Sequence, residues 1–156
     1  MKFSRLILLF AFICSLQAVS AQEMRRAFIL GENEAQYDQL RTDFARTYLT
    51  VFDYDQERAL REWFKLLQAV EGYGEKINFD LNGLKLYLNV FWNTDGSIAH
   101  IGILPMQNSK NVKSEDVVAF FSSFIRQYVA DGPKSSKKFS HYTSVSFPTF
   151  AKKASN

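Results

Sequence analysis

The feature that most constrains the fold is a segment of strict two-residue alternation, residues 84–92, followed closely by a turn signal. Its apolar side chains occupy every second position: Leu84, Leu86, Leu88, Val90 and Trp92. A period of two places such residues on one face of a β-strand. The pair Asp95-Gly96 follows, and it is favoured in two-residue hairpin turns because both residues tolerate positive φ. A second strand over about 97–104, ended by Pro105, completes a predicted β-hairpin.

A two-residue loop also determines which residues of the hairpin face each other. Trp92 then pairs with Ala99, and Phe91 lies directly opposite His100. In this register one face of the hairpin is continuously apolar. A slip of one residue would mix polar and apolar side chains on that face. The continuous apolar face therefore supports the register.

The opposite face of the hairpin is unusual, because a solvated sheet face should carry mainly Lys, Glu, Thr and Ser. It mixes aromatic, aliphatic and polar side chains instead: Lys85, Tyr87, Asn89, Phe91, Ile98, His100, Gly102 and Leu104, with Tyr142 from the last strand. Two interpretations stay open. Either the first helix covers this face and makes it core, or the face is a recognition surface for a partner or an apolar ligand. The candidate surface residues are Tyr87, Phe91, His100, Leu104, Tyr142 and Ser144.

Three helices and one further strand are predicted around the hairpin. Apolar spacings of three and four residues indicate helices over about 34–48, 56–73 and 114–130, and alternation indicates a last strand over 139–147. Each helix has a good capping residue at its start, namely Asn33, Asp55 and Ser114. The inner face of the second helix carries Ala59, Leu60, Trp63, Leu67 and Val70.

The element order α-α-β-β-α-β predicts a fold of the α+β class. If the third helix runs back along the sheet, the last strand is parallel to the second strand and pairs antiparallel with the first. The predicted fold is therefore a three-stranded antiparallel sheet of strand order 2-1-3, packed with about three helices.

The first 21 residues have the pattern of a secretory signal peptide. Lys2 and Arg5 precede an apolar stretch over 6–16, and the small residues of Val19-Ser20-Ala21 match a cleavage site. The apolar stretch is too short to span a bilayer. We expect cleavage before Gln22, export to the periplasm or beyond the cell, and no stable membrane span afterwards.

Cleavage changes the composition of the chain. The formal net charge falls from +3 to +1 as Lys2 and Arg5 leave, so the positive field that nucleic-acid binding requires is nearly absent. The only cysteine, Cys14, leaves as well, and the mature chain has neither disulfides nor thiol chemistry. We expect the mature chain to form a single α+β domain over 22–150, with a flexible tail over 151–156.

No pattern in the mature chain identifies a reaction. It contains no G-x-S-x-G, P-loop or H-E-x-x-H motif, and Asp53-Tyr54-Asp55 is explained by Asp55 as a helix cap rather than by a metal. The only histidines, His100 and His141, are expected on the two outer strands and on opposite faces, which does not suit a zinc site. We therefore expect no catalytic residues, no metal site and no cofactor; a hydrolase built around either histidine is the least favoured alternative.

The hairpin and the elements after it resemble the TonB C-terminal domain family. Residues 83–98 carry a Gly, an alternating strand and the sequence Asp95-Gly96-Ser97-Ile98, and residues 142–147 are similar to the family's final strand. Over about 83–148 the resemblance implies a periplasmic α+β module that adds a partner's strand to the free edge of its last strand. Because the signal peptide looks cleavable, energy transduction is not implied. The chain is also similar to small secreted proteins of Gram-negative envelopes, which implies no chemistry.

Two functions from different classes follow. The first is a non-catalytic envelope protein that binds a protein or peptide at a free sheet edge, where unpaired N–H and C=O groups accept another strand. The alternative is a carrier of a small apolar or aromatic ligand on the face of Tyr87, Phe91 and His100, which predicts a closed apolar pocket there. The oligomeric state stays open.

Overall fold

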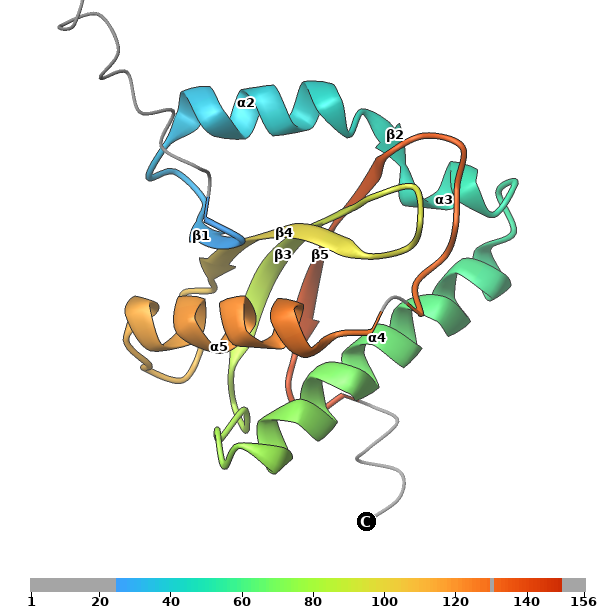
Figure 1. Cartoon of the computed structure of the whole chain (residues 1–156). Coiled ribbons are helices and arrows are strands. Elements are labelled where there is room, and N and C mark those ends of the chain that lie inside the picture. Colours follow the sequence, from blue (N-terminus) through green and yellow to red (C-terminus); the bar gives the residue numbers. More distant parts are fainter. Residues whose placement is uncertain (1–24, 130, 150–156) are drawn as a thin grey trace, which may run out of the picture.

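The computed structural model describes residues 25–129 and 131–149 (Figure 1). The predicted signal peptide, residues 1–21, and the predicted tail, residues 151–156, lie outside the described residues. The cleavage site and the start of the mature chain at Gln22 therefore remain predictions.

The described residues form an α+β fold around a five-stranded mixed sheet of order β1-β4-β3-β5-β2. The strands are β1 (Ala27–Ile29), β2 (Arg46–Thr47), β3 (Lys85–Trp92), β4 (Ile98–Pro105) and β5 (Phe139–Ser146). The helices are α2 (Glu34–Asp43), α3 (Tyr48–Val51), α4 (Gln56–Lys76) and α5 (Ser114–Gln127).

The prediction of a three-stranded antiparallel sheet is wrong, because two short strands extend the sheet on both sides. The three predicted strands are the neighbours β4, β3 and β5, and their pairings are antiparallel. β1 adds to β4 in parallel and β2 adds to β5 in parallel, which makes the sheet mixed. β1 has three residues and β2 has two, too few to show alternation in a sequence.

The prediction of one helix over 34–48 is also wrong beyond Asp43. α2 ends at Asp43, β2 follows, and the short α3 begins at Tyr48, so the described chain has four helices where about three were expected. The apolar stripe that suggested one helix is divided between two cores: Phe44 packs with Phe91, and Tyr48 packs with Trp92. These partners are adjacent in β3 and point to opposite faces of the sheet, which one straight helix could not contact at once.

Two of the three predicted helix caps are formed. The side chain of Asn33 accepts a hydrogen bond from Gln36 N at 3.3 Å, and that of Asp55 accepts one from Arg58 N at 3.0 Å. Ser114 is instead the first residue of α5, after Lys113, whose side chain makes no capping bond.

The predicted hairpin register is confirmed except near the turn. Val90 pairs with Ile101 and Phe91 with His100, but Trp92 pairs with Ile98 rather than Ala99. Of the turn residues only Gly96 has positive φ, at +87°, and Asn93 N donates to Ser97 O at 2.9 Å, so the loop has three residues. A bulge between Phe91 and Trp92 then compensates for the extra loop residue.

The bulge exchanges the faces of two residues on β4. Ile98 belongs to the larger core cluster, whereas Ala99 packs with the smaller cluster on the opposite face. The predicted faces of these two residues are therefore wrong, whereas Ile101 and Ile103, further from the turn, line the larger core as the continuous apolar face requires.

Helices cover both faces of the sheet. α4 and α5 supply Trp63, Val70, Phe121 and other side chains to the larger core on one face. α2 supplies Leu40 and Tyr37 to the smaller cluster on the opposite face, and Figure 1 shows α2 and α5 on opposite sides of β1. We call these the α4/α5 face and the α2 face.

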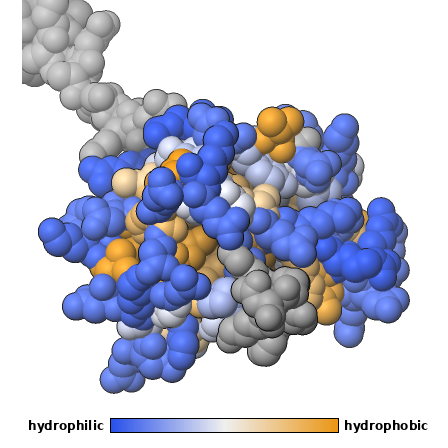
Figure 2. All heavy atoms as spheres, turned by 90° about the horizontal axis from the view of Figure 1, so that it is seen from below, coloured by the Kyte–Doolittle hydropathy of each residue, from blue (hydrophilic) through white to orange (hydrophobic). Residues whose placement is uncertain are grey.

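The outer surface near α4 and α5 is mainly polar. Figure 2 shows this side, seen from below relative to Figure 1, with apolar atoms visible between hydrophilic side chains. Within the described residues, no helix combines the length and apolar character needed to cross a bilayer.

Candidate functional site

The α2 face of the sheet is divided into a covered half and an exposed half. In the covered half Phe91 is completely buried, and its ring meets those of Phe44 and Tyr37 edge-on at centroid distances of 5.4 and 6.4 Å. Of the two interpretations of this face, coverage by the first helix therefore holds here. Phe91 is a core residue and is not available to a ligand.

His100 lies on the strand beyond Phe91 and is partly buried. Its Nδ1 is 3.2 Å from the carbonyl oxygen of Arg25, and burial lowers the pKa of its imidazole. A cavity of about 560 Å³ that it shares with Arg26 and Arg126 lies beside the end of α5. The structure thus places His100 away from Tyr142, because β3 separates their strands.

Four of the predicted surface residues form the exposed half. Tyr87 in β3 pairs with Leu104 in β4 and with Ser144 in β5, so these three are neighbours across the sheet. Tyr142 stacks on Tyr87 with ring centroids 5.9 Å apart and an interplanar angle of 11°. Tyr142 is 52% exposed and Leu104 is 39% exposed, which is high for large apolar side chains on a sheet.

Asn89 marks the boundary between the two halves and was not singled out from the sequence. It is 4% exposed, and its Nδ2 donates to the hydroxyl oxygen of Tyr37 at 3.0 Å. Its Oδ1 has no hydrogen-bond partner among the described residues. A buried amide with one unsatisfied oxygen ties α2 to the sheet at some cost in stability.

The outer edge of β5 is open beyond its first two residues. β2 pairs only with Phe139 and Ser140, and within the described part of the chain no strand lies beside His141–Ser146 on that side. The N–H of Phe147 donates to Leu84 O at 2.9 Å, towards β3. Since backbone groups alternate along a strand, those of Tyr142, Ser144 and Ser146 point outward.

On the α4/α5 face, the same part of β5 carries His141. Its ring stacks on Tyr48 and meets Trp63 edge-on, both at a centroid distance of 4.8 Å. Burial lowers the pKa of His141 to about 4, so the imidazole is neutral at pH 7. The two histidines thus lie on opposite faces, as predicted, and the described residues contain no group of three or more His, Cys, Asp or Glu placed to hold a metal.

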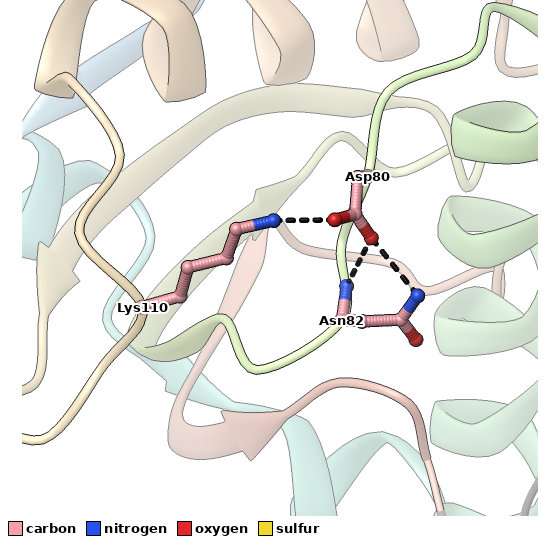
Figure 3. A network of polar contacts seen from close by, with 3 residues as sticks. All are labelled: Asp80, Asn82 and Lys110. Carbon is pink, nitrogen blue, oxygen red and sulfur yellow. Dashed lines mark hydrogen bonds and ion pairs between the residues drawn. The ribbon is translucent and has the colours of Figure 1, made fainter.

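Polar contacts cluster at the end of the sheet where β5 ends. Asp80 accepts hydrogen bonds from Asn82 N at 3.0 Å and Asn82 Nδ2 at 2.9 Å, and it pairs with Lys110 (Figure 3). The hydrogen bond from Lys110, above all, holds the pKa of Asp80 below its usual range. A cavity of about 370 Å³ next to this network is lined by the buried Glu71, whose carboxylate accepts bonds from Thr149 N and Oγ1 at 2.7 and 2.8 Å. The contact between Asp80 and Lys110 joins the loop before β3 to the loop after β4, and the contact between Glu71 and Thr149 anchors the segment after β5 to α4.

A third cavity, of about 610 Å³, lies between α2 and Ser140. None of these three cavities is lined by Tyr87, Phe91 or Tyr142. The closed apolar pocket expected of a ligand carrier is therefore not found among them.

The chain matches no protein-family model, no curated protein and no solved structure. The candidate site therefore rests on its own geometry: an open strand edge with exposed aromatic and aliphatic side chains beside it.

Proposed function

We propose that this protein is an exported, non-catalytic envelope protein that binds an extended segment of a protein or peptide at the outer edge of β5. The observation that carries the proposal is the unpaired edge over Tyr142–Ser146. An added strand would satisfy the outward N–H and C=O groups there, and such backbone hydrogen bonds supply much of the affinity in strand addition.

The pairing of β2 supports this use of the edge. Arg46 and Thr47 already add in parallel to Phe139 and Ser140, so the start of this edge already pairs with another strand. A partner segment would pair with β5 beyond the point where the chain leaves its edge and enters α3. Tyr142 would contact its side chains on the α2 face, with Tyr87 stacked behind Tyr142.

The carrier hypothesis is less well supported. It placed the ligand on Tyr87, Phe91 and His100, but Phe91 is covered by α2 and His100 lies on the far side of β3. The export part of the proposal depends on residues 1–21 and on the resemblance to the TonB C-terminal domain family. Intact-mass measurement of the protein recovered from the cell envelope tests export, with Gln22 expected as its first residue.

The partner is found by capture from the cell envelope with the purified chain 22–156, followed by mass spectrometry. The edge is then tested with Ser144→Pro, which removes an outward N–H, and with Ser144→Ala as the matched control that keeps it. We expect the proline variant to lose binding and the alanine variant to retain it, with both folded by circular dichroism. Equal binding by the two variants would contradict strand addition.

A further inference from the structure

The apolar face of α4 is wider than the sheet that covers it. The side chains along the centre of this face are buried against the sheet, as Trp63 and Val70 show. One flank of the face is covered by α5. The hydroxyl of Tyr73 lies 2.6 Å from Ser123 Oγ, and the Tyr73 ring packs on Phe120 of α5. On the other flank Leu60, which the sequence placed on the inner face, is 52% exposed, and Phe64 is only partly buried.

The uncovered flank lies on the side of β5. With about 100° per residue, Leu60 and Phe64 lie about 60° and 100° to one side of Trp63, whereas Tyr73 lies about 80° to the other. Glu71 shares the flank of Leu60 and Phe64, and it binds Thr149, three residues after the end of β5. The flank that carries Leu60, Phe64 and Glu71 therefore faces the β5 side of the sheet, away from α5.

We infer that this flank is the floor of the peptide site, and that the partner is an extended segment with apolar side chains at alternate positions. This inference rests on the proposed function. A strand added to β5 would continue the sheet by about 4.8 Å, over the Leu60 side of α4. Every second side chain of that strand would point towards α4 and cover Leu60 and Phe64; the others would lie on the side of Tyr142.

Continuity with the β2–β5 pairing favours a partner strand over other occupants. The open part of the edge begins where β2 ends and the chain turns into α3, so an added strand would pair with Tyr142–Ser146 on the same side of β5 as β2. The floor also gives a role to the exposed Leu60, which lies beside the buried stripe of α4. A second copy of the chain or its own residues 150–156 would be the competing occupants, and the test separates them.

The test uses a library of random ten-residue peptides displayed on phage and selected on the chain 22–156. We expect the selected peptides to carry apolar residues at positions i, i+2 and i+4. Kd is then measured by calorimetry with a synthetic copy of one selected peptide against four forms of the protein: unchanged, Leu60→Gln, Ser144→Pro and Val129→Gln. Val129 is the matched control, because it is an exposed apolar residue that belongs neither to α4 nor to β5 and follows the end of α5 by two residues.

Leu60→Gln should weaken binding by about fivefold or more, because half of a leucine side chain is left to be buried by the peptide. Val129→Gln should leave Kd unchanged and Ser144→Pro should abolish binding. If Ser144→Pro abolishes binding and Leu60→Gln does not change it, the proposal that α4 forms the floor of the site is wrong, whereas strand addition to β5 is supported. If neither variant matters, or if no peptide is selected, both proposals fail.

Sedimentation of the peptide-free protein separates the remaining occupants. A monomer that binds the peptide supports the inference. A dimer that Ser144→Pro dissociates would overturn it in favour of a second copy. A chain ending at Thr149 that binds the peptide at least tenfold more tightly than the full chain would assign the groove to residues 150–156.

Discussion

The imidazole of His141 stacks on the ring of Tyr48, with centroids 4.8 Å apart and an interplanar angle of 27°. The strand that forms the open edge is held in this way to the helical layer beneath it. Trp63 meets the imidazole edge-on, and burial keeps the ring neutral at pH 7 by lowering its pKa to about 4.

This lowered pKa predicts a loss of stability in acid. Between the folded pKa near 4 and the unfolded value near 6.5, the unfolded chain binds more protons, so unfolding becomes easier as the pH falls. From pH 7 to pH 4 we expect His141 to reduce the free energy of unfolding by about 3 kcal/mol. Urea unfolding at several pH values measures this directly.

The control is His141→Phe, which keeps an aromatic ring on Tyr48 and cannot titrate. Its stability should fall less between pH 7 and pH 4 than that of the unchanged protein. Some acid sensitivity should persist, because burial also lowers the pKa of His100. Identical pH profiles for the two proteins would mean that His141 is not the group responsible.

Two glycines of α4 should respond in opposite directions to replacement by alanine. Gly72 has open space where a Cβ would be built, whereas a Cβ at Gly74 would lie 2.9 Å from Leu81 Cδ1 and 3.2 Å from Phe79 O. Gly72→Ala should therefore stabilise the protein by about 0.5–1 kcal/mol through helix propensity. Gly74→Ala should destabilise it, because the crowding atom is a backbone carbonyl of Phe79, a residue that the bond from Phe79 N to Gly74 O at 2.8 Å holds in place. Thermal unfolding of the pair distinguishes the signs, and a loss of stability in Gly72→Ala would contradict the open surroundings of that residue.

The sequence was most informative where a pattern extends over several turns or strand pairs. The hairpin and the last helix and strand are each defined by many side chains in one period, and the caps Asn33 and Asp55 are local hydrogen bonds that a sequence can show. β1 and β2 have no period to detect, because their strand conformation comes from pairing with β4 and β5. The strand order of the whole sheet could not be predicted without them.

Only part of the candidate site could be predicted, because the pattern of side chains along a strand shows which face a residue is on but not what covers that face. Tyr142 and Leu104 stood out because they are apolar on a face that should be polar, and both are exposed. Phe91 has the same pattern and is buried, because α2 ends early enough for Phe44 to pack on it. Exposure of Leu60 could not be predicted, since it depends on how far the sheet extends over α4.

Substitutions on adjacent residues of β3 test the two faces of the sheet. Val90→Asp places a carboxylate in the larger core and should cost on the order of 3 kcal/mol or more. Asn89 is also buried, so Asn89→Asp should cost about 1–3 kcal/mol rather than being neutral as for a solvated face. Chemical denaturation measures both. A neutral Asn89→Asp would show that α2 does not cover this position in solution.

The last prediction concerns the segment that leaves the sheet after β5. The two oxygens of Glu71 accept bonds from Thr149 N and Thr149 Oγ1, and both residues are buried. Glu71→Leu removes both acceptor oxygens and leaves the Thr149 N–H and hydroxyl without their partner, so the free energy of unfolding should fall by about 1.5–3 kcal/mol. Thr149→Val removes only the hydroxyl bond and should cost less than Glu71→Leu. Because each change affects the same pair, the double variant should cost less than the sum of the two single variants. Urea unfolding of the four proteins completes this cycle, and strictly additive losses would show that Glu71 does not hold the chain through Thr149.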